Sequence, residues 1–309
     1  MTTTSTLHPT GSAEPGQPAW RQTGAVVGQY TILILLTGVF IFPLLFMIVS
    51  SFKATNADIF ADLHSLRAFL PVGNVSLNNY VSVFQASKFP RFLANSIGLS
   101  AATIALSLVV NSLAGYALSR LRWKGQRLVL TIIIATLIVP FETVAIPLLL
   151  LVSKLPNLTF DNGVTFTQGW LNTYQVQIIP FVAGAYSIFL FYQFFQDIPR
   201  ELDEAALVDG ANRLQIYLNV IVPNSGPVFA AVAILTFLGS WNSFLWPTMV
   251  IQSEDIRPVM VGLQYFFQQN VQWGQVMAYT TMITIPVLLL FLVFQNAFVR
   301  SIASTGIKE

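Results

Sequence analysis

Six apolar stretches, each about as long as a helix that crosses a bilayer, constrain this chain more than any other feature. About 20 apolar residues are enough to span the hydrocarbon core of a membrane. The stretches fall at 26–50, 92–118, 128–151, 176–196, 226–250 and 276–298. Charged residues make up 9% of the 309 residues, whereas a soluble domain has about 25%. The sequence therefore predicts an all-α integral membrane protein with six transmembrane helices.

Proline interrupts most of these predicted spans. A proline inside a helix frees backbone groups that neighbouring helices or a wet cavity must satisfy. Such breaks suit a translocation path, but proline is also common in membrane helices for packing reasons alone. Both interpretations are open for Pro43, Pro140, Pro147, Pro180, Pro247 and Pro286.

The two ends of the chain differ from the apolar centre. The N-terminal residues are rich in Thr, Ser, Gly and Pro and cannot bury enough apolar surface to fold alone, so we expect a disordered tail. The apolar segment that follows exceeds the roughly 7–15 residues of a signal-peptide core, and we expect it to remain as a membrane span. The predicted organisation is a tail at 1–25, a six-span domain at 26–300 and a C-terminal tail at 301–309.

The cationic residues predict the orientation of the chain. Six helices place both termini on one side of the membrane. If that side is the cytoplasm, the cations inside are Arg21, Arg120, Arg122, Lys124, Arg127, Arg200, Arg213, Arg300 and Lys308. Those outside are Lys53, Arg67, Lys88, Arg91, Lys154 and Arg257. Because cytoplasmic loops carry an excess of Lys and Arg, we expect cytoplasmic termini, a cytoplasmic loop at 197–223, and a location in the plasma (inner) membrane.

The polar loop at 197–223 is expected to fold as two short helices with a bend between them. Pro199 suits the first turn of a helix, and the acidic residues around it favour the positive end of the helix dipole. We predict a helix from about Pro199 to Asp209. Gly210 can adopt the left-handed conformation that ends a helix, and Asn212 can cap a second helix that runs toward Pro223.

This loop also offers a surface to another protein. Ala205 and Ala206 have almost no side-chain bulk, so a partner could approach the backbone closely, and Glu204 is available to a partner Arg or Lys. An ordinary solvated loop is the alternative interpretation. Five acids and two bases between 197 and 213 give a local charge of −3. Because phosphate contacts need cations, this balance argues against a DNA-binding helix-turn-helix, and we expect no nucleic-acid partner.

The spacing of residues in the loop resembles the EAA loop of ABC-importer permeases. The residues that match are Glu204, Ala205, Ala206, Gly210 and Pro223. The family pattern ends in Ile-x-Leu-Pro, whereas 220–223 reads Val-Ile-Val-Pro here, so two aliphatic positions depart conservatively. In that family the loop docks a cytoplasmic ATPase. The resemblance therefore implies a coupling-helix loop whose docking residues are Glu204, Ala205, Ala206, Asp209, Gly210 and Pro223.

The same resemblance implies the other partners of the chain. They are a second homologous permease, a dimer of the ABC ATPase and an extracytoplasmic solute-binding protein, assembled in the lipid bilayer. ATP and Mg²⁺ would be bound by the ATPase, because this chain lacks the G-x-x-x-x-G-K-[ST] loop that cradles phosphate. We therefore expect no cofactor and no enzymatic activity in this subunit.

Further segments resemble the carbohydrate branch of these permeases, the type that includes the maltose system. They are AGYALSR at 114–120 with WKG at 123–125, FLGSWN at 237–242, and SSFK at 50–53. The resemblance covers about residues 26–300 and implies a sugar or related polyol as cargo. The chain departs from the branch at 156–170, which we interpret as an external insertion rich in turn-forming residues. That insertion could contact the binding protein or pack on the transporter itself.

Glu142 lies within the third predicted span and is a candidate for the translocation pathway. A charged side chain at the centre of a membrane costs about 2.5–3.5 kcal/mol on insertion scales. The carboxylate should therefore face water or a protein partner. A structural hydrogen bond to another helix, with the carboxyl protonated, fits equally well.

Other polar residues in the predicted spans join Glu142 as pathway candidates. Asn111, Asn242 and Ser243 could contact a hydroxylated solute or join helices by hydrogen bonds. Trp241 could stack on a sugar ring or anchor the chain at the membrane interface, and both interpretations stay open. For Trp246 the interface anchor is the better interpretation.

Two other functions are compatible with these observations. A stand-alone secondary transporter could use Glu142 as a proton carrier, and its uptake would depend on a proton gradient rather than on ATP. A membrane enzyme has less support, because His8 and His64 lie in the tail and in an outer loop without an H-E-x-x-H motif. The chain has no cysteine, so it has neither disulfides nor thiolate ligands.

Overall fold

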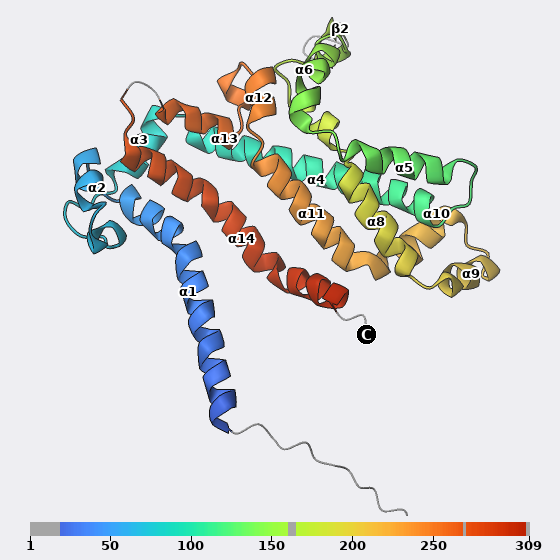
Figure 1. Cartoon of the computed structure of the whole chain (residues 1–309). Helices are drawn as coiled ribbons and strands as arrows, with labels where there is room; N and C mark the ends of the chain where they lie inside the picture. Colours follow the sequence, from blue (N-terminus) through green and yellow to red (C-terminus); the bar gives the residue numbers. More distant parts are fainter. Residues whose placement is uncertain (1–18, 160–164, 268–269, 307–309) are drawn as a thin grey trace, which may run out of the picture.

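The computed structural model describes residues 19–159, 165–267 and 270–306, and these are mostly helical (Figure 1). Four of the described helical segments are each long and apolar enough to cross a bilayer: α1 (Ala19–Ser51), α4 (Phe89–Ser119), α11 (Gly226–Trp241) together with the preceding turn at Pro223–Ser225, and α14 (Trp273–Gly306). Two bent pairs, α5 with α6 and α7 with α8, reach that length and hydropathy only as pairs. With each pair counted as one span, the prediction of an all-α protein with six spans is confirmed.

The third predicted span, 128–151, is wrong as a single helix. The structure instead has α5 (Gln126–Thr136) and α6 (Phe141–Val152), whose axes differ by 104°. Pro140 has no N–H to donate, and its ring disfavours helical backbone at Val139. Its own backbone is extended, with ψ at 143°. One helix therefore ends before Pro140 and the next begins after it, whereas Pro147 lies inside α6 without ending it.

The fourth predicted span is also interrupted, by a smaller angle of 42°. It consists of α7 (Tyr174–Ile178), the 3₁₀ turn η2 (Ile179–Phe181) and α8 (Ala185–Asp197). The side-chain amide of Asn111 on α4 donates to the carbonyl of Val182 (2.9 Å), and its oxygen accepts from the N–H of Gly184 (3.0 Å). A neighbouring helix thus satisfies backbone groups that the break after Pro180 frees, as a membrane interior requires.

The fifth predicted span, 226–250, ends early. Helix α11 stops at Trp241, and the short helix α12 (Leu245–Val250) follows after a three-residue link. The backbone N–H and the side-chain amide of Asn242 both donate to the carbonyl of Leu238 (3.1 and 2.9 Å), which closes the last turn of α11. Pro247 lies in the first turn of α12, where a missing N–H costs no hydrogen bond.

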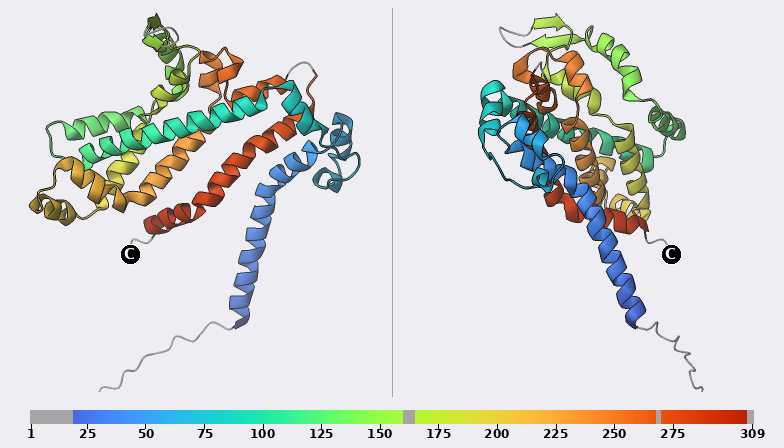
Figure 2. Two further views of the ribbon diagram at one scale, coloured as in Figure 1. Left: turned by 180° about the vertical axis from the view of Figure 1, so that it is seen from behind. Right: turned by 60° about the vertical axis from the view of Figure 1, so that its left-hand side comes forward.

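Helix α4 is the element around which the other spans are arranged. Helices α8 and α11 pack along it, α14 packs on α11, and α1 packs on α14 (Figure 1). Both views in Figure 2 show that α1 leaves the bundle toward its N-terminus. Only 6% of the most apolar part of α1 is buried. Such an exposed apolar surface suits contact with lipid or with another membrane protein.

A glycine allows α4 and α8 to pack closely. A Cβ atom at Gly115 would lie 2.5 Å from the Cβ of Phe191 and 3.1 Å from the backbone nitrogen of Tyr192. No side chain larger than hydrogen fits there without a shift of the backbone. Small residues have this role generally where membrane helices meet.

The end of the bundle near α12 carries most of the shorter connecting elements. They are α2 (Asn56–Asp62), η1 (Leu66–Phe69), α3 (Asn78–Ala86), η5 (Glu254–Ile256), α13 (Val259–Gly262) and η6 (Leu263–Phe266). The buried Lys53 forms an ion pair with Asp62 and donates to the carbonyl of Arg67 (3.2 Å). Asn79 donates to the carbonyls of Ser51 (2.9 Å) and Lys53 (2.8 Å). The buried Lys53 and Asn79 therefore hold the segment that follows α1 in place.

The predicted insertion forms the one sheet among the described residues. Strands β1 (Pro156–Thr159) and β2 (Thr165–Gln168) pair antiparallel, with Pro156 opposite Gln168. The indole of Trp170 donates to the carbonyl of Pro156 (2.8 Å), which closes the base of the hairpin. The predicted turn formers at 161–163 lie outside the described residues.

We expect the variant Gly115→Val to destabilise the permease fold by about 1–3 kcal/mol, because the new side chain overpacks the contact between α4 and α8. The matched control is Gly98→Val on the same helix, where a Cβ atom meets nothing within 4 Å. The measurement is the thermal unfolding midpoint of the purified proteins. Equal midpoints for the two variants would contradict the close packing at Gly115.

Candidate functional site

The loop after α8 begins with a short helix whose limits agree with the sequence prediction. Helix α9 (Arg200–Val208) starts directly after Pro199 and has Glu201 and Asp203 in its first turn. Gly210 ends it with a φ of +83°, in the left-handed region that favours glycine. The N–H of Ala211 donates to the carbonyl of Ala206 (2.9 Å), which closes the last turn.

The second helix of the loop is capped as predicted. Helix α10 (Arg213–Ile216) begins at Asn212, whose side chain accepts from the N–H of Gln215 (2.9 Å). The side chain of Gln215 in turn accepts from the N–H of Asn212 (2.8 Å), so the two form a reciprocal capping box. A single π-type turn, η3 (Tyr217–Ile221), and the 3₁₀ turn η4 (Pro223–Ser225) then lead into α11. The segment from α9 to η4 is called the coupling loop below.

One side of the coupling loop is exposed. Glu204, Ala205, Asp209, Gly210 and Pro223, five of the six predicted docking residues, are exposed, and Ala206 is half-buried against the core. Five apolar side chains that the sequence argument overlooked also lie exposed on the loop: Leu202, Leu207, Val208, Leu214 and Leu218. Leucine and valine at the tip of a polar loop were the signal that could have identified them. Exposed apolar side chains next to a carboxylate suit a protein contact.

The opposite side of the coupling loop is bound to the end of α4 through a buried ion pair. Arg120 and Asp203 are 7% and 8% exposed, and Nη1 of Arg120 lies 3.5 Å from Oδ2 of Asp203. Nη2 of Arg120 also donates to the carbonyl of Ile198, at the end of α8. Burial lowers the pKa of the Arg120 guanidinium, and the Asp203 charge opposes that shift. Arg120 therefore joins α4, α8 and α9 at one point.

Two further contacts attach the loop to α4. The hydroxyl of Tyr116 donates to the carbonyl of Arg213 (3.0 Å), and the hydroxyls of Ser112 and Tyr217 lie 2.6 Å apart. The rings of Tyr116 and Tyr217 are in contact, with centroids 5.2 Å apart. The segment 114–120, identified from sequence by resemblance, therefore includes the residues that hold the coupling loop.

A comparison with known families decides what kind of protein this is. Residues 108–304 match the model of the family described as "Binding-protein-dependent transport system inner membrane component". The chain belongs to this family. The match begins within α4 and contains α9 and α10, so it includes both residues of the Arg120–Asp203 pair. The protein is thus a multi-pass membrane component of a binding-protein-dependent transport system, and is called the permease below.

Individual relatives are similar to this chain along nearly its whole length. The lactose transport system permease protein LacG of Rhizobium radiobacter is 33% identical, over 88% of this chain and 93% of that protein. The arabinooligosaccharides transport system permease protein AraQ of Halalkalibacterium halodurans is 30% identical, over 87% and 91%. A solved bacterial ABC transporter involved in alginate import has a TM-score of 0.75 at 23% identity, covering 92% of this chain and 99% of that one. The structural likeness supports the fold.

Two of the pathway candidates do not line the cavity that the helices enclose. Asn111 is fully buried. Its side chain hydrogen-bonds to the backbone of Val182 and Gly184 at the break before α8, and it also donates to Ser107 (2.7 Å). Glu142 lies exposed in the first turn of α6, where the helix dipole favours a carboxylate. Neither residue lines the cavity described next.

The candidates at the end of α11 separate into different environments. Trp241 is 2% exposed and stacks on Phe237, with centroids 5.2 Å apart, as part of the core. Asn242 is exposed at the end of the helix. Ser243, in the link to α12, is the one predicted pathway residue that lines a cavity of about 420 Å³ among the described residues.

The interface-anchor interpretation of Trp246 is wrong. Its side chain is 1% exposed, and its indole donates to the carbonyl of Val176 (2.8 Å). The rings of Phe141 and Phe181 contact it edge-on, each with centroids 6.0 Å away. Trp246 therefore joins α12 to α6 and α7 in the protein core.

Sequence reasoning missed a stripe of small polar residues along α4. Its members recur every three or four positions on one buried face: Ser96, Ser100, Thr103, Ser107 and Asn111. The hydroxyl of Ser100 donates to Ser240 on α11 (3.2 Å), and Ser107 lies 3.4 Å from the hydroxyl of Thr236. The spacing itself was the signal, because residues three and four apart share a helix face.

Breaking the Arg120–Asp203 pair from either side should destabilise the permease more than removing both charges. Arg120→Met or Asp203→Leu alone leaves one buried charge without a partner, which costs about 3–5 kcal/mol. The double variant removes both charges, so its loss should be clearly smaller than the sum of the two single losses. Thermal unfolding midpoints of the four proteins measure the coupling. Additive losses would contradict the pair.

Proposed function

We propose that the permease forms the membrane pathway of an ABC importer for a sugar or related polyol, driven by a cytoplasmic ATPase that docks on the coupling loop. The observation that carries this proposal is the two-sided structure of that loop. Its tip exposes Glu204, Leu207 and Val208, and its base is fixed to α4 through Arg120 and Asp203. A partner that moves the tip would therefore move α4 as well.

The cargo class is supported by the relatives. The permeases similar to this one serve lactose and arabinooligosaccharides by name, and they cover nearly its full length. A neutral sugar is rich in hydroxyls, so hydrogen bonds and ring stacking suffice to hold it. We assign a carbohydrate or polyol cargo to this permease on that basis.

The proposed assembly contains four kinds of subunit. A second homologous permease would complete the pathway, a solute-binding protein would deliver the sugar from outside, and a dimer of the ATPase would bind ATP and Mg²⁺. This permease would then have no cofactor and no catalytic residue. Closure of the ATPase dimer on ATP would pull the coupling loop and convert the spans from inward- to outward-facing, so the free energy comes from the partner.

The remaining site assignments also belong to this proposal. Glu204, Ala205, Ala206, Asp209, Gly210 and Pro223 form the ATPase contact, and Ser243 belongs to the pathway. Glu142 lies exposed at the start of α6, which gives a proton-carrying role no support from the cavity. The two functions differ in their energy source. An ABC importer should take up sugar with ATP even after a proton gradient has collapsed, whereas a proton-coupled secondary transporter should not.

The proposal is tested by ATPase co-purification together with ATP-driven sugar uptake into vesicles. Glu204→Lys reverses the charge at the tip, and Gly210→Val adds a Cβ atom at positive φ, a conformation that costs a β-branched residue about 1–2 kcal/mol. Both variants should lose ATPase binding or uptake, in part if the second permease offers its own loop. They should insert into the membrane and pair with that permease as the wild type does.

Two matched controls make this experiment specific to the docking surface. Glu254→Lys makes the same charge change on η5, outside the coupling loop, at a side chain that is 44% exposed. Gly73→Val makes the same strained substitution at a φ of +90°, outside the coupling loop and with nothing within 4 Å of the new Cβ atom. The control variants should keep ATPase binding and uptake. Normal values of both for the double variant Glu204→Lys/Gly210→Val would overturn the assignment.

The proposed orientation has a separate test. A reporter fused to the C-terminus should report the cytoplasm, and one inserted between β1 and β2 should report the outside, because the positive-inside bias places the coupling loop inside. The measurement is the activity of a compartment-specific reporter enzyme in intact cells. A reporter at the C-terminus that is active only outside would remove the basis for ATPase docking.

A further inference from the structure

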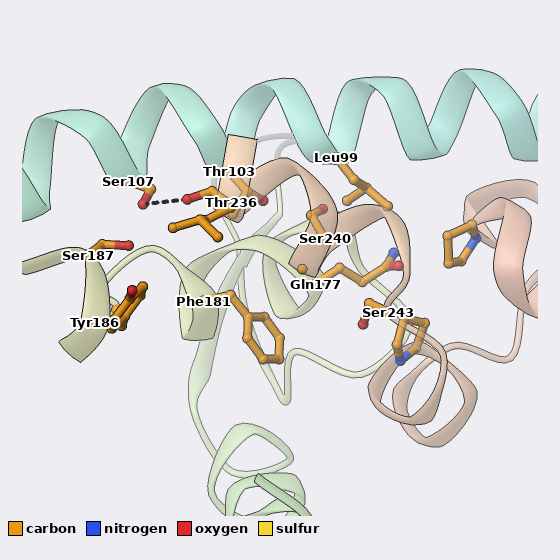
Figure 3. A pocket seen from close by; sticks show the side chains of 15 residues that line it. Leu99, Thr103, Ser107, Gln177, Phe181, Tyr186, Ser187, Thr236, Ser240 and Ser243 are labelled. Carbon is orange, nitrogen blue, oxygen red and sulfur yellow. Dashed lines mark hydrogen bonds between the residues drawn. The ribbon is translucent and has the colours of Figure 1, made fainter. Parts of the chain in front are cut away.

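The cavity that Ser243 lines is built from parts of the chain that are distant in sequence. Helix α4 forms one wall, η2 and α8 with the preceding α7 form another, and α11 with its link to α12 forms the third (Figure 3). Its volume is about 420 Å³, within the range of about 300–1,000 Å³ for small-molecule sites. The cavity also lies at two of the three interrupted spans, the fourth and the fifth, and secondary transporters build their substrate sites at such broken helices.

The walls of this cavity are neutral and rich in hydroxyl groups. Among the fifteen described residues that line it, none carries a formal charge at neutral pH. Six of them are serine or threonine: Thr103, Ser107, Ser187, Thr236, Ser240 and Ser243. Phe181 presents an aromatic ring to the same space (Figure 3). Hydroxyls and the aromatic rings of Phe181 and Tyr186, without charge, are the chemistry that recognises an uncharged polyhydroxyl compound.

Two buried oxygen atoms in the walls have no hydrogen-bond partner within the described chain. They are Oγ1 of Thr103, a residue 2% exposed, and Oε1 of Gln177, a residue 8% exposed. The amide nitrogen of Gln177 is occupied, because it donates to the carbonyl of Ile256 (3.2 Å). Buried polar atoms are nearly always satisfied. These two acceptors therefore point to a ligand that supplies donors.

The neighbours of Thr103 show that its lack of a partner is particular to that position. On α4, Ser100 lies three residues before it and Ser107 four residues after it, and both make contacts to hydroxyls of α11. Thr103 lies between them on the same buried face of α4 and makes no such contact. Its side chain lines the cavity instead (Figure 3).

We propose that this cavity is a binding subsite for one unit of a neutral saccharide, so that this permease contacts the cargo itself. Hydroxyl groups of the sugar donate to Thr103 Oγ1 and Gln177 Oε1, and Phe181 packs against the apolar face of the ring. An acidic sugar is excluded, because the walls offer no cation to a buried carboxylate. The inference rests on the proposed function and specifies its cargo as uncharged.

The subsite is tested by protection of a thiol in the assembled transporter. The chain has no cysteine, so Ser243→Cys provides a unique reactive group on this subunit. The rate of its modification by N-ethylmaleimide is measured in membrane vesicles with lactose, maltose or arabinotriose, and with an alginate trisaccharide as the acidic counterpart. Thr248→Cys is the control, because Thr248 lies exposed on α12 and does not line the cavity.

We expect at least one neutral saccharide to slow modification of Ser243→Cys several-fold and to leave Thr248→Cys unaffected, while the acidic trisaccharide has no effect. Adding Thr103→Val or Gln177→Leu should raise the half-protecting concentration about three- to tenfold, as the loss of one hydrogen bond does. Thr281→Val is the matched control, because its hydroxyl donates to Met277 (2.7 Å) on α14, away from the cavity.

The outcomes separate this inference from the proposed function. Protection by none of the neutral saccharides, or equal protection by the acidic one, would overturn the subsite. An unchanged half-protecting concentration in both Thr103→Val and Gln177→Leu would overturn it as well. If a neutral saccharide is imported with ATP and yet gives no protection, the subsite alone fails. If ATP drives no import and no ATPase binds, the proposed function fails.

Discussion

The burial of Arg120 beside Asp203 is the interaction that joins α4, α8 and α9 at one point. A guanidinium removed from water is tolerated only with a counter-charge and hydrogen bonds close by. Arg120 finds them in Asp203 on α9 and in the carbonyl of Ile198 at the end of α8. One side chain at the end of α4 therefore fixes the coupling loop to two spans. Without it, the coupling loop would still be joined to the bundle by the Tyr116 and Tyr217 contacts and by the packing of buried residues such as Ile216, but α9 would lose its polar link to α4.

Helix α4 connects the coupling loop with the cavity. At one end it has Gly115 against α8 and Arg120 against α9. Nearer its middle, Thr103 and Ser107 form a wall of the cavity. A helix with an intact hydrogen-bond ladder transmits displacement along its length with little loss. A movement imposed on α9 therefore reaches Thr103 through one rigid element, whereas α8 and α11 each adjoin a break in their spans.

The parts of the fold that local rules govern could be predicted from the sequence. Pro199, Gly210 and Asn212 fixed the helices of the coupling loop, because capping and left-handed backbone depend on a few adjacent residues. The bend at Pro140 was not predicted as a turn of 104°, because proline alone allows either a kink or a break. Trp246 and the Arg120–Asp203 pair were missed for a related reason: each depends on residues 70 or more positions away, and burial decides its role.

Because Arg120 joins them, α9 and α4 are expected to move as one body, and this is tested by measuring the distance between them. Because the chain has no cysteine, spin labels can be placed at Glu201→Cys on α9 and Leu113→Cys on α4, both exposed positions. Double electron–electron resonance then measures the distance between the two spin labels in the resting transporter and in the transporter trapped with ATP. We expect the same distance distribution in both states. A shift of about 5 Å or more, one helical turn, would contradict it.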